Sequence, residues 1–468
     1  MARPSTIGEL RESGYRPLSV KQEMRKNLIK RLQNGTSLFE GIVGYEDTVL
    51  PQIENAILAG QDIVFLGERG QAKTRMARAL VQLLDEETPI IAGSEVNDEP
   101  LAPISEMGRR AVEEHGDKTP ITWIGQDGRY GEKLATPDIT IADLIGEVDP
   151  IKVAEGRYLA DELTIHFGLL PRTNRGIFVL NELPDLAERI QVGLLNIMEE
   201  RDVQIRGYKV RLPLDLFVVA SANPEDYTNR GRIITPLKDR FGAQIRTHYP
   251  QTIEHEIAIM EQERTSFGED GFTTVVPEFI KEVLAEITHL ARRSSDISQR
   301  SGVSVRVSIC NYETVLSAAL KRSIRLREAQ VTPRVSDLSA VMTSTAGKIE
   351  LDSVGEGSEE KIIDKLIQRA VLNVFNRHMN VAEMQELIQS FDRGLHIEVA
   401  PDMPSLEYMA QASEVAGLAP AISRLGVAGN PSSVASAMEF VLEGLHLSRK
   451  LNKDRTQGSP AGRFRYGS

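Results

Sequence analysis

The sequence contains a single cysteine, Cys310, among its 468 residues, so it cannot form an internal disulfide framework. No segment approaches the roughly 18 uninterrupted apolar residues that a membrane-spanning helix needs. Residues 1–13 also lack the apolar core of a signal peptide. The 8 histidines are scattered singly, without HExxH or another metal-ligand spacing, and we predict no zinc site. These absences favour a cytoplasmic protein in a reducing compartment.

A positive charge balance is also missing, because the formal net charge is −12. An acidic chain is a poor match to a phosphate backbone, and the sequence has no helix-turn-helix signature or zinc module. We therefore do not favour a nucleic-acid partner, although a local basic patch on an assembly could still bind one. At this length the chain exceeds the size at which one core keeps growing, which predicts two or three domains.

What the sequence does contain is a glycine-bearing loop between an apolar run, Ile63 to Leu66, and a segment with helical spacing. Backbone N–H groups of such a loop and the start of the helix cradle phosphates. Lys73 would reach the outer phosphates and Thr74 would hold Mg²⁺. Ala72 stands where the GxxxxGK[ST] pattern has its second glycine, and it adds only a methyl group. An ordinary strand-to-helix turn is the alternative interpretation. The residues predicted to contact the nucleotide here are Gly67, Glu68, Arg69, Gly70, Gln71, Ala72, Lys73, Thr74 and Arg75.

Polar residues end the apolar run of residues 176–180, where an NTPase places a metal-associated carboxylate followed by a catalytic glutamate. Glu182 is the candidate base that activates water and is also a candidate residue of the metal site. Asn181 stands where aspartate is usual and would contact the metal through a bound water, with one negative charge fewer. Hydrolysis is therefore expected to be slower than in an aspartate-bearing relative. The next apolar run, residues 216–222, ends in Asn223, which we predict to orient the attacking water.

Two arginines are candidates for reading the third phosphate. Arg240, in the segment LKDRF, is predicted to act as an arginine finger from a neighbouring subunit, and a surface salt bridge is the alternative. Arg306, in GVSVRVS at a helix start, is predicted to read the nucleotide from a helical lid.

Residues 203–212 alternate apolar and polar side chains around a glycine, which predicts a β-hairpin. A basic, protruding finger and an ordinary solvated hairpin are both compatible with this pattern. Its basic residues are Arg206, Lys209 and Arg211.

The order of patterns predicts an α/β domain followed by helices. Residues 1–40 are typical of a helical arm with a solvated basic face, and residues from Asp454 onward of a disordered tail. Residues 41–250 predict a three-layer parallel sheet between helices, residues 251–350 a helical lid and residues 351–453 a helical extension. The expected strands are 63–66, 89–92, 121–124, 177–180 and 216–221. The expected later helices are 251–265, 277–293, 307–323, 334–348, 360–376, 380–391, 405–416 and 432–448.

Taken in order, these motifs resemble the AAA+ ATPases, within the helix-2 insert branch that contains the MoxR-type ATPases and the I subunit of magnesium chelatase. The segment around Val43 is similar to the family's adenine-side segment, and the GxxGxAKT spelling is usual in MoxR relatives. Residues from about 140 to 172 are similar to the branch's helix-2 insertion, and residues 202–213 to its hairpin. Asn223 with the following PED, and Asp239-Arg240-Phe241, match its "NPEE…LDRF". The resemblance covers residues from about 40 to 350.

The resemblance implies an ATP hydrolase that binds Mg²⁺ and ATP between subunits of a homo-oligomer, a ring hexamer. It also implies a chaperone-like role, in which a partner carrying a von Willebrand factor A domain is remodelled, activated or loaded with a metal or cofactor. An alternative is a nucleotide-gated assembly scaffold that hydrolyses little, which Asn181 raises. A DNA-acting motor or transcription regulator is a third, less favoured function.

Overall fold

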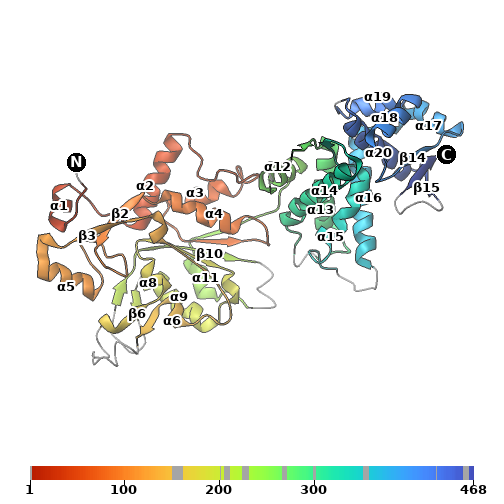
Figure 1. Ribbon diagram of the computed structural model, residues 1–468. Coiled ribbons are helices and arrows are strands. Elements are labelled where there is room, and N and C mark those ends of the chain that lie inside the picture. The colour runs from red at the N-terminus through yellow and green to blue at the C-terminus, as the bar shows by residue number, and fades with distance from the viewer. Residues whose placement is uncertain are drawn as a thin grey trace. The chain divides into compact units, whose positions relative to one another are not determined.

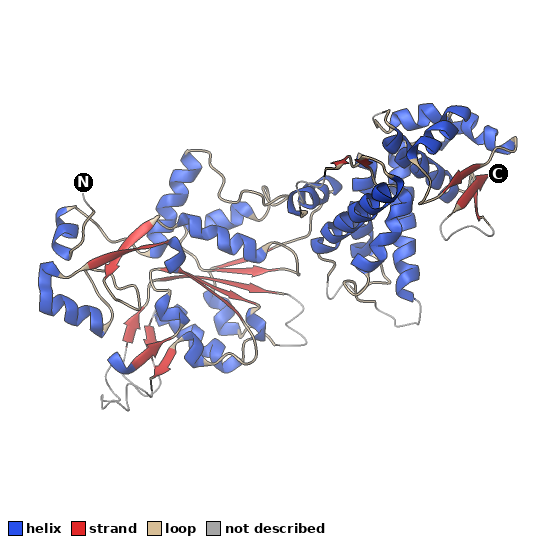
Figure 2. Cartoon of the chain, viewed as in Figure 1, coloured by secondary structure: helices blue, strands red, loops and turns tan. Residues whose placement is uncertain are grey.

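The computed structural model describes residues 3–149, 162–200, 202–204, 211–223, 231–265, 271–298, 302–351, 358–427, 429–456 and 463–467. The chain forms two compact units that meet in sequence between His248 and Tyr249. The first unit is α/β and the second is mainly helical (Figure 2). No helix among the described residues is long and apolar enough to cross a membrane.

The first unit is built on a five-stranded sheet with helices packed on it (Figure 1). The strand order is β11-β1-β10-β7-β4, and every neighbouring pair is parallel. The inner strands β1, β7 and β10 are buried along their whole length, as strands are when helices cover both faces. This explains their continuous apolar runs. The strands are β1 (Ile63–Leu66), β4 (Tyr130–Leu134), β7 (Gly176–Asn181), β10 (Leu216–Ala222) and β11 (Ala243–Arg246).

Two of the predicted strands lie outside this sheet. β2 (Glu87–Ile91) and β3 (Ile121–Gly125) instead pair with each other, antiparallel. Pro89 in β2 has no N–H to give to a ladder, which suits a strand with one neighbour only. Their places in the main sheet are taken by β4 and β11, whose mixed polar sequences gave no strand signal.

Helices cover the two faces of the sheet and bury opposite sides of its strands. Residues of β1 alternate between the two cores, with Ile63 and Phe65 in one and Val64 and Leu66 in the other. The first core also takes Met24 of the N-terminal arm, so the arm packs on the sheet as well as presenting a basic face. The helices at the first core are α2 (Val20–Gln33), α3 (Leu50–Leu58) and α4 (Lys73–Ala79), and those at the second are α6 (Ile141–Leu144), α8 (Leu169–Arg172), α9 (Glu188–Glu200) and α11 (Thr235–Arg240).

Smaller elements complete the first unit. The predicted insertion contains the antiparallel pair β5 (Gly146–Val148) and β6 (Ile165–Phe167). The predicted hairpin is present as β8 (Asp202–Gln204) paired with β9 (Arg211–Pro213), whereas Arg206 and Lys209 lie outside the described residues. Two further helices accompany β2 and β3, namely α1 (Ile7–Glu12) and α5 (Glu106–His115).

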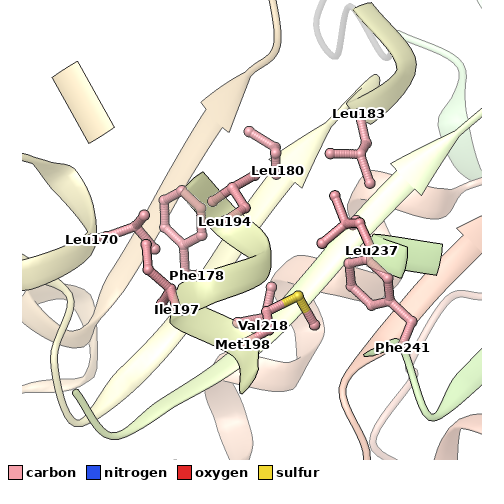
Figure 3. Close-up of a pocket in the computed structure, with 11 residues that line it drawn as sticks. Leu170, Phe178, Leu180, Leu183, Leu194, Ile197, Met198, Val218, Leu237 and Phe241 are labelled. Carbon is pink, nitrogen blue, oxygen red and sulfur yellow. The ribbon is translucent and has the colours of Figure 1, made fainter. Parts of the chain in front are cut away.

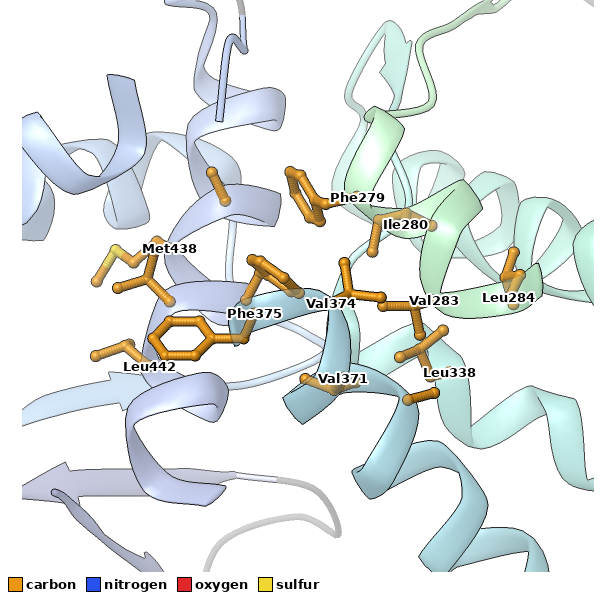
Figure 4. Close-up of a cluster of buried hydrophobic side chains, with 14 of the residues drawn as sticks. Phe279, Ile280, Val283, Leu284, Leu338, Val371, Val374, Phe375, Met438 and Leu442 are labelled. Carbon is orange, nitrogen blue, oxygen red and sulfur yellow. The ribbon is translucent and has the colours of Figure 1, made fainter. Parts of the chain in front are cut away.

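The second unit packs its helices around a common core. Phe279 of α13 stacks on Phe440 of α20 with ring centroids 4.5 Å apart. Helix α16 contributes Val374 and Phe375 to the same cluster as Phe279 (Figure 4). The segments expected as a lid and as a separate extension therefore share one core. The helices are α12 (Ile253–Glu263), α13 (Glu278–Arg293), α14 (Val305–Leu326), α15 (Val341–Thr345), α16 (Ser358–His378), α17 (Gln385–Asp392), α18 (Ser405–Glu414), α19 (Leu418–Arg424) and α20 (Pro431–Leu447).

The expected disordered tail is instead partly ordered. Phe464 to Gly467 form a strand of a small antiparallel sheet, in which Tyr466 is 2% exposed and its hydroxyl bonds to Glu443. Burial of this aromatic ring outweighs the polar composition around it. The sheet has the order β14 (Ile397–Val399), β16 (Phe464–Gly467) and β15 (Asn452–Arg455), and a separate short pair joins β12 (Thr273–Thr274) to β13 (Gln330–Val331).

Candidate nucleotide-binding site

The predicted phosphate loop connects β1 to α4 and is shaped by left-handed backbone at Gly70 (φ 78°) and Ala72 (φ 55°). Ala72 occupies the N-cap position of α4, so the chain keeps the left-handed turn with alanine. Lys73 begins the helix and is only 7% exposed. Its ammonium group donates to the carbonyl oxygens of Gly67 and, at 2.8 Å, Glu68. The lysine side chain therefore lies over the loop. The outer phosphates of a bound nucleotide would compete with these carbonyl oxygens for its ammonium group.

The loop is tied to the segment after β11. The side-chain oxygen of Gln71 accepts from the backbone N–H of Glu68 at 3.0 Å and from the hydroxyl of Thr247 at 2.6 Å. A side chain at Gly67 would overlap both Thr247 and Gln71, so glycine is required there. Glu68 and Gly70 are half-buried, and Arg69 and Arg75 are exposed.

The predicted adenine-side segment lies close to the Gln71–Thr247 hydrogen bond. Val43 is half-buried in the loop that precedes α3. Two residues along, the hydroxyl of Tyr45 lies 3.1 Å from the carbonyl oxygen of Gln71 and 2.6 Å from that of His248. Burial raises the pKa of Tyr45, which keeps the phenol protonated. Sequence reasoning missed Tyr45, Thr247 and His248, because no motif links them to the loop.

On the other side of the loop, polar groups of α4, β7 and β10 converge. The Thr74 hydroxyl lies 3.5 Å from Asn181 Oδ1, and the Ser221 hydroxyl donates to the same oxygen at 3.1 Å. Ser221 also accepts from the backbone N–H of Glu182 at 3.3 Å. Glu182 has a left-handed backbone (φ 56°), a conformation that costs free energy in a residue with a side chain and that clusters at functional sites.

Asn223 follows β10 at the same edge of the sheet. It is 3% exposed, and its side-chain oxygen has no hydrogen-bond partner among the described residues. Strand register places Leu66 beside Ala222 and Leu180 beside Ala220, so the strands leading to Lys73, Asn181 and Asn223 end together. A buried amide oxygen without a partner suits a residue that holds a water or a ligand.

The structure adds an acidic residue that the sequence did not single out. Glu132 of β4 accepts a hydrogen bond from Asn181 Nδ2 at 2.8 Å. Burial raises the pKa of Glu132, but hydrogen bonds from Arg78, Tyr130 and Asn181 outweigh it, so the pKa lies below its ordinary value. Glu132 is therefore a carboxylate at neutral pH. Its sequence setting, YGEKL, is indistinguishable from that of a solvated edge strand.

Of the two predicted arginines, Arg240 belongs to this unit and Arg306 to the other. The guanidinium of Arg240 is 37% exposed and pairs with Glu199 of α9. Leu237 and Phe241, on either side of it in sequence, point into a small apolar pocket under α9 and fix the end of α11 (Figure 3). Within one chain, Arg240 thus makes the surface salt bridge that was its alternative interpretation. Arg306 is exposed at the start of α14.

The site's donor set fits a magnesium nucleotide. Among the described residues, no group of three or more His, Cys, Asp or Glu side chains could hold a metal by itself. Mg²⁺ typically keeps several waters and binds nucleotide phosphates with only one or two protein ligands. Thr74 and a water on Asn181 meet that need, and the bound ion would neutralise phosphate charge.

Comparison with known proteins identifies relatives of this chain. The chain is 27% identical over 303 residues to magnesium-chelatase subunit ChlI of Mesostigma viride, covering 62% of this chain and 78% of the relative. It is 24% identical over 361 residues to the ChlI subunit of Nephroselmis olivacea, covering 70% of this chain and 94% of the relative. The match to ChlI of a Nostoc species is 27% over 265 residues, with 54% and 64% covered. No protein-family model matches the chain.

Solved structures that align with the chain include a putative ATPase from Cytophaga hutchinsonii, at 17% identity and a TM-score of 0.32, covering 77% of this chain and 98% of that one. The complex of subunits BchI and BchD of magnesium chelatase aligns at 19% identity with a TM-score of 0.36, covering 69% and 98%. Superpositions this weak carry no argument about function. The sequence matches, the phosphate loop and the parallel sheet support an AAA+ ATPase of the MoxR and magnesium-chelatase I-subunit branch.

Proposed function

We propose that this protein binds ATP with Mg²⁺ at the loop of residues 67–75 and hydrolyses it within a ring of identical subunits. The observation that carries the proposal is the convergence of Lys73, Thr74, Asn181, Glu182 and Asn223 at the edge where β1, β7 and β10 end. Ligands of open parallel sheets bind at the carboxyl ends of the strands. The left-handed backbone of Glu182 is a feature of a site that acts on a ligand. So is the buried side-chain oxygen of Asn223, which has no hydrogen-bond partner among the described residues.

Each side chain has a distinct role in this proposal. Lys73 leaves its loop carbonyls for the outer phosphates, and Thr74 with Asn181 holds the metal side. Glu182 takes the proton of the attacking water, which Asn223 orients through its buried amide oxygen. Positioned general bases typically contribute factors of about 10² to 10⁴ in rate.

Measuring phosphate release by the wild type and by Glu182→Gln tests this assignment. The variant should bind ATP with the affinity of the wild type and release phosphate at least about 100-fold more slowly. Equal rates for the two proteins would remove Glu182 from catalysis and favour the nucleotide-gated scaffold that Asn181 suggests.

Arg240 is proposed to serve the site of the neighbouring subunit. It is exposed, and among the described residues its guanidinium pairs with the carboxylates of Glu199 and Asp239, which a ring contact could replace. An arginine acting in trans predicts complementation, because a mixture of Arg240→Ala and Glu182→Gln subunits contains interfaces where both residues are intact. Phosphate release should be low for each variant alone and should rise on mixing. Arg232→Ala, which removes another exposed arginine of the unit, is the matched control. No gain on mixing would place Arg240 outside the neighbouring site.

Assembly and partner form the last part of the proposal. We propose a hexameric ring whose cycle remodels, activates or loads a metal or cofactor into a protein carrying a von Willebrand factor A domain, with Arg306 of the second unit reporting the nucleotide state. Light scattering with and without ATP should show a nucleotide-dependent rise to six subunits. A purified von Willebrand factor A protein should co-elute with ATP-loaded Glu182→Gln and not with Lys73→Ala. Co-elution with both variants would mean that binding of this partner is independent of the nucleotide.

A further inference from the structure

The carboxylate of Glu132 is the centre of a closed hydrogen-bond network beside the metal side of the site. One oxygen accepts from Asn181 Nδ2 at 2.8 Å and from Arg78 Nη2 at 3.0 Å. The other accepts from Arg78 Nε at 2.8 Å and from the Tyr130 hydroxyl at 2.8 Å. The Glu132 side chain is 20% exposed, whereas that of Arg78 is 64% exposed. Arg78 lies one helical turn after Thr74 on α4. Both ends of the network, Arg78 at Glu132 and Thr74 at Asn181, are therefore on the helix that follows the phosphate loop.

This network decides which way the amide of Asn181 points. A carboxylate only accepts hydrogen bonds, so the NH₂ group of Asn181 must face Glu132. The amide oxygen then faces Ser221 and Thr74, at 3.1 and 3.5 Å. A flipped amide would set its oxygen against the carboxylate and leave the NH₂ group beside the hydroxyl that is expected to bind the metal.

The same geometry explains why asparagine stands where aspartate is usual. An aspartate at position 181 would place a carboxylate oxygen about where Nδ2 lies, 2.8 Å from an oxygen of Glu132. Two carboxylates this close cannot both ionise without strong repulsion. Glu132 and Asn181 together therefore carry one negative charge, which lies on the neighbouring strand and is shared with the guanidinium of Arg78.

We propose that Glu132 is the positioning residue of the metal side: it supplies the negative charge that Asn181 lacks and holds the Asn181 oxygen toward Thr74. This inference rests on the proposed binding of ATP with Mg²⁺. In aspartate-bearing relatives, the charge that offsets Mg²⁺ lies at the position of Asn181. In this chain we assign that charge to Glu132 of β4, which one hydrogen bond joins to Asn181.

Nucleotide affinity in the presence of Mg²⁺ should change in a defined direction among four proteins: wild type, Glu132→Gln, Asn181→Asp and the double variant. Glu132→Gln removes the charge, and Asn181→Asp creates repulsion, so each alone should weaken binding. The double variant regains one charge and one hydrogen bond, because the glutamine NH₂ group can donate to Asp at position 181. Lys133→Gln, which removes one charge from the next position of β4, is the matched control.

The experiment titrates a fluorescent ATP analogue into each protein with excess Mg²⁺ and with EDTA. In Mg²⁺, each single variant should lose about 10-fold or more in affinity, the range for residues that orient metal ligands, and the double variant should recover to within about 3-fold of wild type. In EDTA the affinities of the four proteins for the analogue should agree within about 3-fold, because Glu132 acts on the metal side. Single-variant losses that multiply in the double variant, or an unaffected Glu132→Gln, would overturn the proposal.

A second readout separates this inference from the proposed function. If the wild type shows no Mg²⁺-dependent nucleotide binding, the proposed function fails. Thermal unfolding of the nucleotide-free proteins still tests the contact between residues 132 and 181. Asn181→Asp should lower the melting temperature, and adding Glu132→Gln to the same chain should restore it. Lack of restoration there would refute the Asn181–Glu132 coupling itself.

Discussion

The ammonium group of Lys73 lies 2.8 Å from the backbone carbonyl oxygen of Glu68, inside the loop that it is expected to serve. Nucleotide binding must exchange this internal hydrogen bond for phosphate oxygens, which are charged and form stronger bonds with an ammonium group. We therefore predict that Mg²⁺-ATP raises the melting temperature of the wild type and leaves that of Lys73→Ala unchanged. A thermal-shift titration measures this, with the exposed Lys118→Ala as the control that keeps the full shift.

The backbone at Ala72 gives a second prediction, because its φ of 55° suits glycine better than alanine. A left-handed conformation costs an L-residue roughly 1–2 kcal/mol, and glycine's greater freedom in the unfolded chain offsets part of any gain. Ala72→Gly should thus raise the free energy of unfolding by up to about 1 kcal/mol in urea titrations. A loss of stability would mean that the contacts of the alanine methyl group matter more than the strain.

The N-terminal arm is held by a buried ion pair, which gives a third prediction. Arg129, 1% exposed, donates from Nη1 to Glu23 of α2 at 2.8 Å and from Nε to a backbone carbonyl oxygen at 2.7 Å. Removing one partner leaves a buried charge unpaired, so Arg129→Met should cost about 3–5 kcal/mol of unfolding free energy. Lys30→Met, at an exposed position of the same helix, should change it by less than about 0.5 kcal/mol. A cost for Arg129→Met as small as the control's would show that the pair contributes nothing.

These residues also show how far the sequence could predict the structure. β1, β7 and β10 were predictable because each is buried on both faces and is therefore a continuous apolar run. The residues that end these strands follow from the same runs and from the spacing of the phosphate loop.

The rest depended on contacts between residues far apart in the chain. Glu132 lies in a strand of mixed polarity, and its role follows from meeting Asn181, 49 positions away, which no local pattern encodes. Tyr466 likewise becomes part of a sheet only because Glu443 and β14 are there to receive it. Local composition therefore predicted a disordered tail, and tertiary packing overrode it.

The last prediction concerns pH and the second unit. His378 of α16 lies 2.8 Å from a carboxylate oxygen of Glu282 of α13, and this hydrogen bond raises the pKa of the imidazole above its ordinary 6.5, against partial burial and the charge of Arg377. Glu278 adds to the rise, and Glu286 pairs with Arg377. A raised pKa means that the folded state binds the proton more tightly than the unfolded state. The added stability is therefore complete below pH 6.5 and is lost as the pH rises through the folded-state pKa.

Hydrogen exchange of α13 and α16 in the full chain, measured between pH 5.5 and 8.5 and corrected for intrinsic rates, checks this. Protection should fall across that range by the equivalent of about 1 kcal/mol or less, because the His378 side chain is 29% exposed and solvent screens the pair. His378→Gln keeps a donor for Glu282 but does not titrate, so its protection should be flat. A wild-type profile as flat as that of His378→Gln would mean that the Glu282 contact does not favour the charged imidazole.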